Sequence, residues 1–432
     1  MISLESVKKM YVQDSCHSVA PRDTIKKAVA ALGQVGNGAF YGLEEIGHLD
    51  SMGLPVYKAN SAEESNEWGK GISDEQSQAS AIMERVERYS SVVKHRKKID
   101  LIRSDFNSIK ANAISRNSFE LLNFQKALYG ERKVDEMEMD WAEATSLISG
   151  KKFFVPAQMV FFRYSQRNFK DMVCTTGLAS GNSIEEAINH AICEVIERHI
   201  FHVTYFNRPA IRQIDISTTK NPYLASLIER LRKKGFTIIA NDFTCDMGVS
   251  TVSALVFNPD EKIIFNRYFN YATAPDPEIA LIRVLTEIAQ YRAVSIIMGD
   301  YSTSEKGFFT SVSGEVLDYY DWLSKEEEKI SFDEIDNISH DDFKVEIESM
   351  LEELKKNGYD VLAYDLTHPE LNIPVVRVMI PGLQPNFKML GLSPFSKYAG
   401  VSRHLKIYDE VMERISKRQF DDQTIDEFAE LS

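Results

Sequence analysis

The sequence predicts an α/β (α+β) fold in which two halves repeat a helix–strand–strand unit. The unit occurs at Leu231–Thr244 (LRKKGFTIIANDFT) and again at Leu354–Thr367 (LKKNGYDVLAYDLT). Each copy reads as the end of an amphipathic helix, a glycine just past that end, and then an apolar strand. A second apolar strand follows each copy, at Val249–Phe257 and Pro374–Ile380. A unit that occurs twice in this way indicates pseudo-twofold symmetry within one architecture.

The chain divides into an N-terminal segment and a larger domain. Residues 1–60 contribute to the fold with a helix near Pro21–Leu32 and a short strand at Leu54–Tyr57. Residues 61–432 form the main domain, and its motifs lie within 68–383. We expect an exposed, acidic helical insertion near 317–342 and a charged helical tail after Arg403. Asp242 and Asp365 end equivalent strands, where each carboxylate either caps a turn or acts in catalysis.

Composition and charge argue against several classes of partner and location. The chain has 50 Lys and Arg against 64 Asp and Glu, a net charge of −14. Because no Lys/Arg stripe interleaved with aromatic residues is present, we expect no nucleic-acid partner. No apolar run reaches the roughly 20 residues of a membrane helix, and the N-terminus does not resemble a secretory signal. The four cysteines form no Cys-x-x-Cys pair, so we expect a protein of the reducing cytoplasm.

A second repeat relates two helices at a constant offset. Gly71–Arg88 and Gly181–Arg198 share eight of eighteen residues, including a final Glu-x-x-Glu-Arg. Both copies open with a capping box, at Ser73 and Ser183, and both show helical apolar spacing. A degenerate third copy lies at Asp276–Arg292, with Asp276 as N-cap and a proline as the first helical residue.

The repeated carboxylates suggest a metal site. Glu84 and Glu87 share one helix face, as do Glu194 and Glu197. The alternative is a solvated face in which Glu84 pairs with Arg88. Two copies of adjacent carboxylates favour a bound cation, and Mg²⁺ usually binds between carboxylates and substrate phosphates. A further alternative is a zinc site formed by His190, Glu194, Glu197, His199 and His202, but the His-Glu-x-x-His arrangement is missing.

The chain lacks both common phosphate loops. Neither Gly-x-x-x-x-Gly-Lys-Ser/Thr nor Gly-x-Gly-x-x-Gly occurs. The nearest glycine-rich element is Trp68-Gly-Lys-Gly71, which also fits a simple turn into a helix. A nucleotide would therefore bind through metal and carboxylates, with Arg198 and Arg283 offsetting the charge of the transferred phosphoryl group.

Three segments resemble the ATP-site motifs of the YcaO family in their usual order: GKGISDEQSQASAIMERVERYS, GLASGNSIEEAINHAICEVIERH and PDPEIALIRVLTEIAQYR. VVRVMIPGL at Val375–Leu383 resembles that family's C-terminal signature. The resemblance implies a YcaO-type fold around a central ATP cleft, with ATP and Mg²⁺ as cofactors. It also implies an enzyme that phosphorylates the oxygen of a backbone amide in a peptide or protein substrate.

The resemblance also assigns site residues. The metal-binding carboxylates are Glu84, Glu87, Glu194 and Glu197. The residues around the nucleotide are Thr24, Ser80, Asn182, Glu186, Arg198, Arg283 and Glu287, with Arg198 and Arg283 as catalytic residues. Glu186 has the alternative role of completing the capping box, and Gln290 and Arg292 have the alternative of packing. The basic residue that the family places shortly before Thr24 is not evident.

The chain end suggests the subclass. Azoline-forming members commonly end in Pro-x-Pro-x-Pro, whereas this chain ends FDDQTIDEFAELS. No fused leader-binding domain or helical-repeat extension is evident. In this it is similar to thioamide-forming members that work with a separate, sulfide-delivering TfuA-type partner, including those of methanogens that modify methyl-coenzyme M reductase. The resemblance also suggests a homodimer. The alternatives are an azoline-forming cyclodehydratase for a ribosomal peptide and a non-catalytic peptide-binding scaffold.

Overall fold

The structure is a computed structural model that describes residues 2–36, 38–63, 67–114, 136–164, 175–261, 267–297, 321–325 and 328–383. The helix predicted after Arg403 lies outside the described residues. Within them, no helix is both long and apolar enough to cross a membrane.

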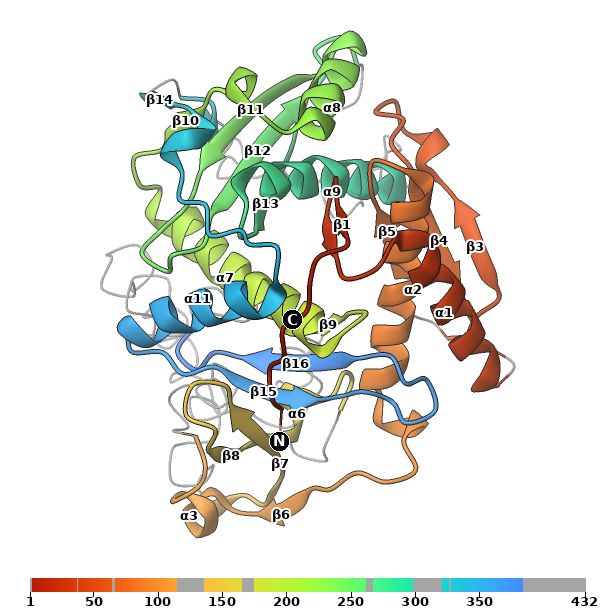
Figure 1. The fold of residues 1–432 in the computed structure, drawn as a ribbon, viewed down its shortest axis with the longest axis vertical. Helices are drawn as coiled ribbons and strands as arrows, with labels where there is room; N and C mark the ends of the chain where they lie inside the picture. The colour runs from red at the N-terminus through yellow and green to blue at the C-terminus, as the bar shows by residue number, and fades with distance from the viewer. Residues whose placement is uncertain are drawn as a thin grey trace, which may run out of the picture.

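The N-terminal segment forms a hairpin, a helix and most of a small antiparallel sheet (Figure 1). Its strands and helix are β1 (Tyr11–Val12), β2 (Cys16–His17), α1 (Pro21–Gln34), β3 (Gly42–Glu45) and β4 (Val56–Asn60). The sheet is completed by β5 (Glu67–Lys70), in the order β3-β4-β5, and leads directly into α2 (Asp74–Ser91). The predicted helix at Pro21 is confirmed, and the predicted strand at Leu54–Tyr57 overlaps the start of β4.

One large sheet has the order β13-β12-β11-β10-β14, antiparallel except for β10 against β14. Its strands are β10 (Arg212–Ile214), β11 (Thr237–Asp242), β12 (Thr251–Phe257), β13 (Arg267–Thr273) and β14 (Glu328–Ile330). The helices α8 (Pro222–Lys233) and α9 (Pro277–Ile297) share a buried core with these strands. In Figure 1 this sheet lies at the top, with α9 running beneath it.

The other large sheet has the order β6-β7-β15-β16-β9, and β8 pairs with β7. Its strands are β6 (Ile102–Ser104), β7 (Met139–Ser146), β8 (Lys152–Pro156), β9 (Leu178–Ser180), β15 (Leu362–Asp365) and β16 (Val375–Met379). The helices of this half are α3 (Phe106–Ile109), α6 (Ala157–Val160), α7 (Ile184–Asn207) and α11 (Phe343–Lys356). In Figure 1, α7 crosses the centre of the molecule between the two large sheets.

The predicted helix–strand–strand repeat is confirmed as α8-β11-β12 and α11-β15-β16. Both helices end in the same Schellman turn, with Gly235 at φ 87° and Gly358 at φ 81°. Asp242 and Asp365 then accept a hydrogen bond from the backbone N–H two residues later, at 2.9 and 2.8 Å. These carboxylates therefore cap turns, which is one of the two predicted alternatives.

The three repeated helices start in equivalent places. Each of α2, α7 and α9 follows a strand (β5, β9 and β13) that pairs antiparallel with a neighbour. Ser73 and Ser183 accept hydrogen bonds from the N–H three residues later, and Asp276 accepts one from Glu278 N at 2.8 Å. The predicted N-caps are therefore confirmed, and the repeat brings three helix faces toward a common centre.

The segment near 317–342 corrects one prediction. Its described part contains a few helical residues at 321–323, the edge strand β14 and a short 3-10 turn, rather than one exposed helix. Trp322, Leu323, Ile330 and Phe332 are all buried. The segment is acidic overall, but these apolar residues lie among the charged ones and are buried in the core.

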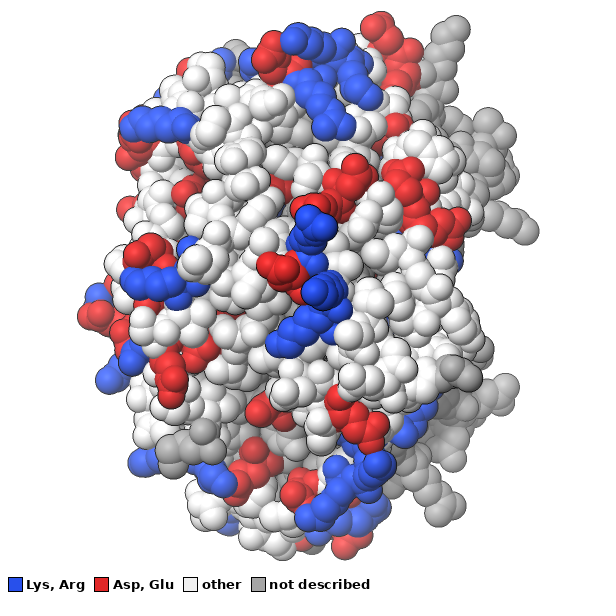
Figure 2. Space-filling model, turned by 45° about the vertical axis from the view of Figure 1, so that its right-hand side comes forward, with Lys and Arg blue, Asp and Glu red and all other residues white. Residues whose placement is uncertain are grey.

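The charged surface is mixed. In Figure 2, small groups of Lys and Arg lie beside Asp and Glu over the whole of this face, separated by uncharged surface.

Candidate nucleotide and metal site

A pocket of about 420 Å³ lies between α2, α7, α9 and the N-terminal hairpin, within the range of roughly 300–1,000 Å³ usual for ligand sites. Its wall contains every residue that the sequence assigned to nucleotide or metal: Thr24, Ser80, Glu84, Glu87, Asn182, Glu186, Glu194, Glu197, Arg198, Arg283 and Glu287. Thr24 and Glu287 are 263 positions apart in the sequence. The fold therefore brings all the predicted nucleotide- and metal-binding residues into one pocket, while the role of each residue remains a prediction.

The carboxylates of α2 are held by Arg88 and by backbone. Glu84 accepts hydrogen bonds from Arg88 Nη2 at 3.0 Å and from Trp68 N at 2.8 Å. Glu87 accepts one from Arg88 Nη1 at 2.9 Å. The Arg88 guanidinium lies over the Phe162 ring, 5.1 Å from its centroid. The salt bridge that a surface helix would show is thus present, but it lies inside the pocket.

The carboxylates of α7 are held in a similar way. Glu194 accepts a hydrogen bond from Gly177 N at 3.1 Å, and Glu197 accepts one from Thr273 N at 3.0 Å. Arg198 Nη2 lies 3.7 Å from Glu194 and 3.9 Å from Glu197. Glu197 is oriented by the backbone of β13 and Glu194 by the turn just before β9, so these positions are set by the fold.

The electrostatics of the pocket favour a bound cation. Burial raises the pKa of Glu87 well above its ordinary value, and the nearby Glu84 and Glu194 carboxylates raise it further against the effect of Arg88. Burial also raises the pKa of Glu197, and Glu287 adds to that rise. Buried carboxylates this close together repel one another unless positive charge compensates them.

The donor set fits Mg²⁺. All four predicted ligands are carboxylates, the hard oxygen donors that Mg²⁺ prefers. Among the described residues, no three His, Cys, Asp or Glu side chains are gathered into a ready-made metal cage. Mg²⁺ commonly binds through one or two carboxylates together with substrate phosphates, so the residues present fit metal that arrives with a nucleotide. Of the zinc alternative, His190 lines the pocket together with Glu194 and Glu197, whereas His199 is fully buried and does not line it.

Cations line the pocket wall near β13 and α9. Arg198 Nη1 donates to the Tyr271 hydroxyl at 3.1 Å, and Arg283 Nη1 donates to Thr273 O at 3.2 Å. Glu287 forms an ion pair with Lys70. Burial alone would raise the pKa of Glu287, but Lys70 and Arg198 outweigh it and lower that pKa to about 2. Phosphate groups entering here would meet three cations.

The opposite end of the pocket is a hydrogen-bonded chain. Thr24 Oγ1 donates to Asn182 Oδ1 at 2.9 Å, and Asn182 Nδ2 donates to Glu186 at 3.0 Å. Glu186 also accepts from Ser18 N at 2.9 Å and contacts His17 Nδ1 at 2.9 Å. Its carboxylate thus faces the N-terminal hairpin. The prediction that Glu186 completes a capping box with its side chain is wrong, although its backbone N–H does bond to Ser183.

The sequence did not predict three basic residues of the pocket, Lys9, His17 and Lys70. His17 lies seven positions before Thr24. Lys70 was assigned only to a turn. Of the two doubtful residues on α9, Gln290 lines the pocket. Arg292 instead packs away from it, 2.8 Å from Asp50 and 3.0 Å from Glu261, so packing is its role.

Two thiols in the pocket wall are poor nucleophiles. Burial raises the pKa of Cys16 to about 11 and that of Cys193 to about 12. Cys193 is buried and Cys16 half-buried, and both thiols stay protonated at neutral pH.

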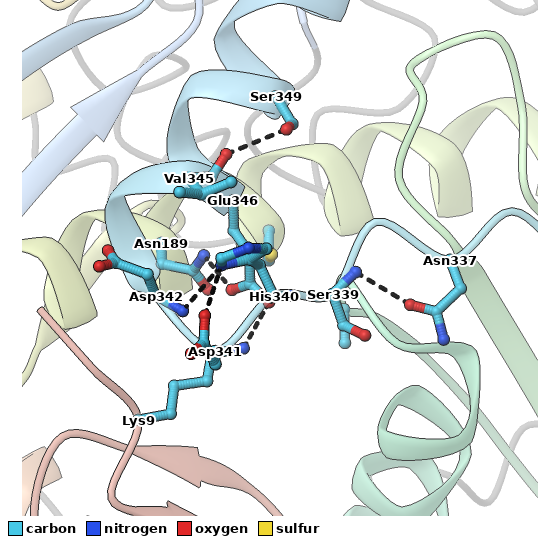
Figure 3. Close-up of polar contacts among 12 residues, drawn as sticks. Lys9, Asn189, Asn337, Ser339, His340, Asp341, Asp342, Val345, Glu346 and Ser349 are labelled. Carbon is cyan, nitrogen blue, oxygen red and sulfur yellow. Dashed lines mark hydrogen bonds and ion pairs between the residues drawn. The ribbon is translucent and has the colours of Figure 1, made fainter. Parts of the chain in front are cut away.

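One margin of the pocket is closed by a buried ion pair between Lys9 and Glu346 (Figure 3). Only 4% of the Lys9 side chain and none of the Glu346 side chain is exposed. Glu346, on α11, also accepts hydrogen bonds from His340 N at 2.8 Å and Asn189 Nδ2 at 3.0 Å. The pair joins the first residues of the chain to α11 and α7.

Replacing Lys9 by methionine is expected to lower the free energy of unfolding by about 3 kcal/mol, because it leaves Glu346 as a buried, uncompensated charge. Thermal unfolding measures the effect. Lys8→Met is the matched control, since Lys8 is 55% exposed and lies 3.0 Å from the exposed Asp341 and 3.6 Å from Asp342. An ion pair of an exposed lysine contributes less than about 1 kcal/mol. The double variant Lys9→Met/Glu346→Gln is expected to recover most of the loss.

This effect should depend on pH with a defined sign. Burial raises the pKa of Glu346 and Lys9 opposes that rise. In Lys9→Met the pKa rises further, so the folded protein holds this proton more tightly than the unfolded chain. The loss of stability is then small below about pH 4.3, the pKa of an unfolded glutamate, and grows as the pH rises toward the folded pKa. A pH-independent loss would contradict the assignment.

Comparisons with known proteins agree with this site. A family model described as YcaO cyclodehydratase, ATP- and Mg²⁺-binding, matches residues 68–384. Because that match covers most of the chain, the chain belongs to the YcaO family. ATP and Mg²⁺, the predicted cofactors, are confirmed at the level of the family, as is its ATP- and Mg²⁺-dependent, cyclodehydratase-like activity.

Two curated relatives are informative. The chain is 33% identical over 383 residues to an uncharacterized protein of Methanothermobacter thermautotrophicus, covering 85% of this chain and 94% of the relative. It is 24% identical over 360 residues to an uncharacterized protein in the tfuA 3′ region of Rhizobium leguminosarum bv. trifolii, covering 80% and 84%.

Solved structures share the fold. YcaO from Methanopyrus kandleri, bound with AMPPCP and Mg²⁺, matches with a TM-score of 0.68 at 22% identity, covering 88% of this chain and 95% of that chain. A heterocyclase in complex with substrate and cofactor matches with a TM-score of 0.75 at 20% identity. That match covers 90% of this chain but 55% of the heterocyclase, so this chain spans about half its length. The predicted YcaO-type fold is confirmed.

Proposed function

We propose that this protein uses ATP and Mg²⁺ to activate a backbone amide of a peptide or protein. The observation that carries the proposal is the shared pocket, in which two Glu-x-x-Glu-Arg helices and a third helix, α9, present all their predicted site residues. A non-catalytic scaffold would have no need to keep four partly buried, mutually repelling carboxylates.

The residues divide into three roles. Glu84, Glu87, Glu194 and Glu197 would hold Mg²⁺, and Thr24, Ser80, Asn182, Glu186 and Glu287 would surround the nucleotide. Arg198 and Arg283 lie beside Glu197 and β13, where they offset charge on the transferred phosphoryl group. ATP supplies that group to the amide oxygen after a nucleophile has added to the amide carbon, and the oxygen then leaves as phosphate.

The nucleophile we propose is sulfide, so that the product is a thioamide. Two facts support this choice over ring closure: one relative is encoded in a tfuA region, and another comes from a methanogen. A TfuA-like partner would then deliver the sulfide. The alternative, azoline formation by a Cys, Ser or Thr side chain of the peptide, is supported by the cyclodehydratase description of the family.

One assay separates the two products. The enzyme is incubated with MgATP, sulfide, a TfuA-like protein and peptides encoded near its gene, and the products are analysed by mass spectrometry. Exchange of one oxygen for sulfur is expected. Loss of one water would identify azoline formation instead, and absence of ATP hydrolysis with every peptide would favour the scaffold.

A further inference from the structure

The Trp68-Gly-Lys-Gly71 element is more than a turn into α2. Strand β5 lies flat on that helix: a Cβ on Gly69 would come within 2.1 Å of Ser77 O and 2.2 Å of Ala81 N. A Cβ on Gly71 would come within 2.7 Å of the Gln76 side chain and 2.9 Å of Ser77 N. Separations this short are not tolerated, so both positions require glycine.

The alternation of the strand then decides where Lys70 points. Glu67, like Gly69, faces α2, where its carboxylate pairs with Arg85 at 3.1 Å. Trp68 and Lys70 face the other way. Lys70 lines the nucleotide pocket and forms an ion pair with Glu287 on α9, a residue 217 positions away in the sequence.

The pair lies at the pocket wall rather than in the core. The Lys70 side chain is 23% exposed and that of Glu287 is 14% exposed. The same wall carries Arg198 and Arg283, which also act on the Glu287 carboxylate. Arg198 also lies 3.7 Å from Glu194 and 3.9 Å from Glu197, whereas Lys70 forms its ion pair with Glu287. A polyphosphate could replace Glu287 as the partner of Lys70, because phosphate oxygens are strong acceptors for ammonium and guanidinium groups.

We propose that Lys70 is a phosphate-binding residue of the nucleotide site, and that Glu287 is the counter-ion that holds it in place until a nucleotide arrives. The inference rests on the nucleotide site proposed above. Within that site, Gly69 and Gly71 allow β5 to pack closely against α2, and Lys70 of β5 provides the positive charge for the phosphate. This arrangement differs from the usual glycine-rich phosphate loops.

Nucleotide binding tests this role without requiring the peptide substrate. Calorimetry compares MgAMPPCP with adenosine in the wild type, Lys70→Met and Lys70→Arg. Lys70→Met is expected to weaken MgAMPPCP binding about 10- to 100-fold, because hydrogen bonds to charged groups are among the stronger ones. Adenosine binding should change less than about twofold, since adenosine has no phosphate. Lys70→Arg should recover part of the loss.

Lys58→Met is the matched control. Lys58 lies on β4 opposite Trp68, 5.4 Å from the centroid of its ring, and does not line the pocket. Its replacement should leave both ligands unaffected. Unchanged MgAMPPCP binding in Lys70→Met, or an equal loss for both ligands, would overturn the role of Lys70 while leaving the nucleotide site intact. Failure of the wild type to bind MgAMPPCP would instead overturn the site itself.

A second measurement separates phosphate binding from a structural tie. With metal-free inorganic tripolyphosphate as the probe, Lys70→Met should bind more weakly than the wild type. Glu287→Gln should bind it more tightly, because the competing carboxylate is gone. If Lys70 and Glu287 merely fastened β5 to α9, both variants would weaken binding together, and the proposal would be wrong.

Discussion

Replacing Glu84 or Glu197 by glutamine is expected to lower ATP turnover at least about 100-fold, the effect of losing one strong electrostatic contact to the reacting phosphates. The change removes a negative charge but keeps an oxygen that can accept from Trp68 N or Thr273 N, so the local fold should persist. Mg²⁺ binds a neutral amide oxygen much less well than a carboxylate. Turnover is measured as release of phosphate, and Mg²⁺-dependent binding of AMPPCP is measured by calorimetry.

The control for these variants is Glu229→Gln. Glu229 is exposed on the outer face of α8 and pairs with Lys233 at 2.6 Å in the same i, i+4 arrangement as Glu84 and Arg88. It should retain full turnover and Mg²⁺-dependent binding. Full turnover in both Glu84→Gln and Glu197→Gln would show that these carboxylates are salt-bridge partners only and that the metal lies elsewhere.

The repeated features of the fold could be predicted because they depend on local signals. Ser73 and Ser183 mark helix starts by their own side chains, and Gly235 and Gly358 mark helix ends by the left-handed backbone they allow. Because each of these local signals occurs twice at a matching position, the repeated helix–strand–strand architecture could be predicted from them. β14 shows the limit: it is a strand because it pairs with β10, a partner more than a hundred residues away, and nothing in its acidic neighbourhood indicates that pairing.

The residues of the candidate site that belong to the family motifs could be predicted from the sequence. Residues that enter the site only through tertiary contacts could not. Lys70 pairs with Glu287, and that contact depends on two glycines that press β5 onto α2. No spacing rule connects residues on a strand and on a distant helix. Glu186 shows the converse: its position three residues after Ser183 fits a capping box, yet tertiary contacts with His17 and Ser18 determine where its carboxylate goes.

Replacing Arg198 by methionine is expected to lower ATP turnover about 100- to 1,000-fold, because a guanidinium that stabilises a transferring phosphoryl group acts mainly in the transition state. Its position is well supported: it donates to the Tyr271 hydroxyl, and Tyr271 in turn stacks on Phe201 at 4.2 Å between ring centroids. Lysine should recover little, because one ammonium cannot replace the planar fork of the guanidinium. The steady-state rate of ATP hydrolysis measures the loss.

The comparison of binding with turnover makes this prediction specific. If Arg198 acts on the transferred group, Arg198→Met should bind MgADP within about tenfold of the wild type, since ADP lacks that group. A parallel loss of MgADP affinity and turnover would make Arg198 a ground-state binding residue instead. Arg103→Met is the control, because Arg103 is 61% exposed and forms long ion pairs with Glu138, at 3.4 Å, and Asp140, at 3.6 Å. Its turnover should equal that of the wild type, so that a loss seen only in Arg198→Met reports on the phosphoryl group and not on the removal of an arginine as such.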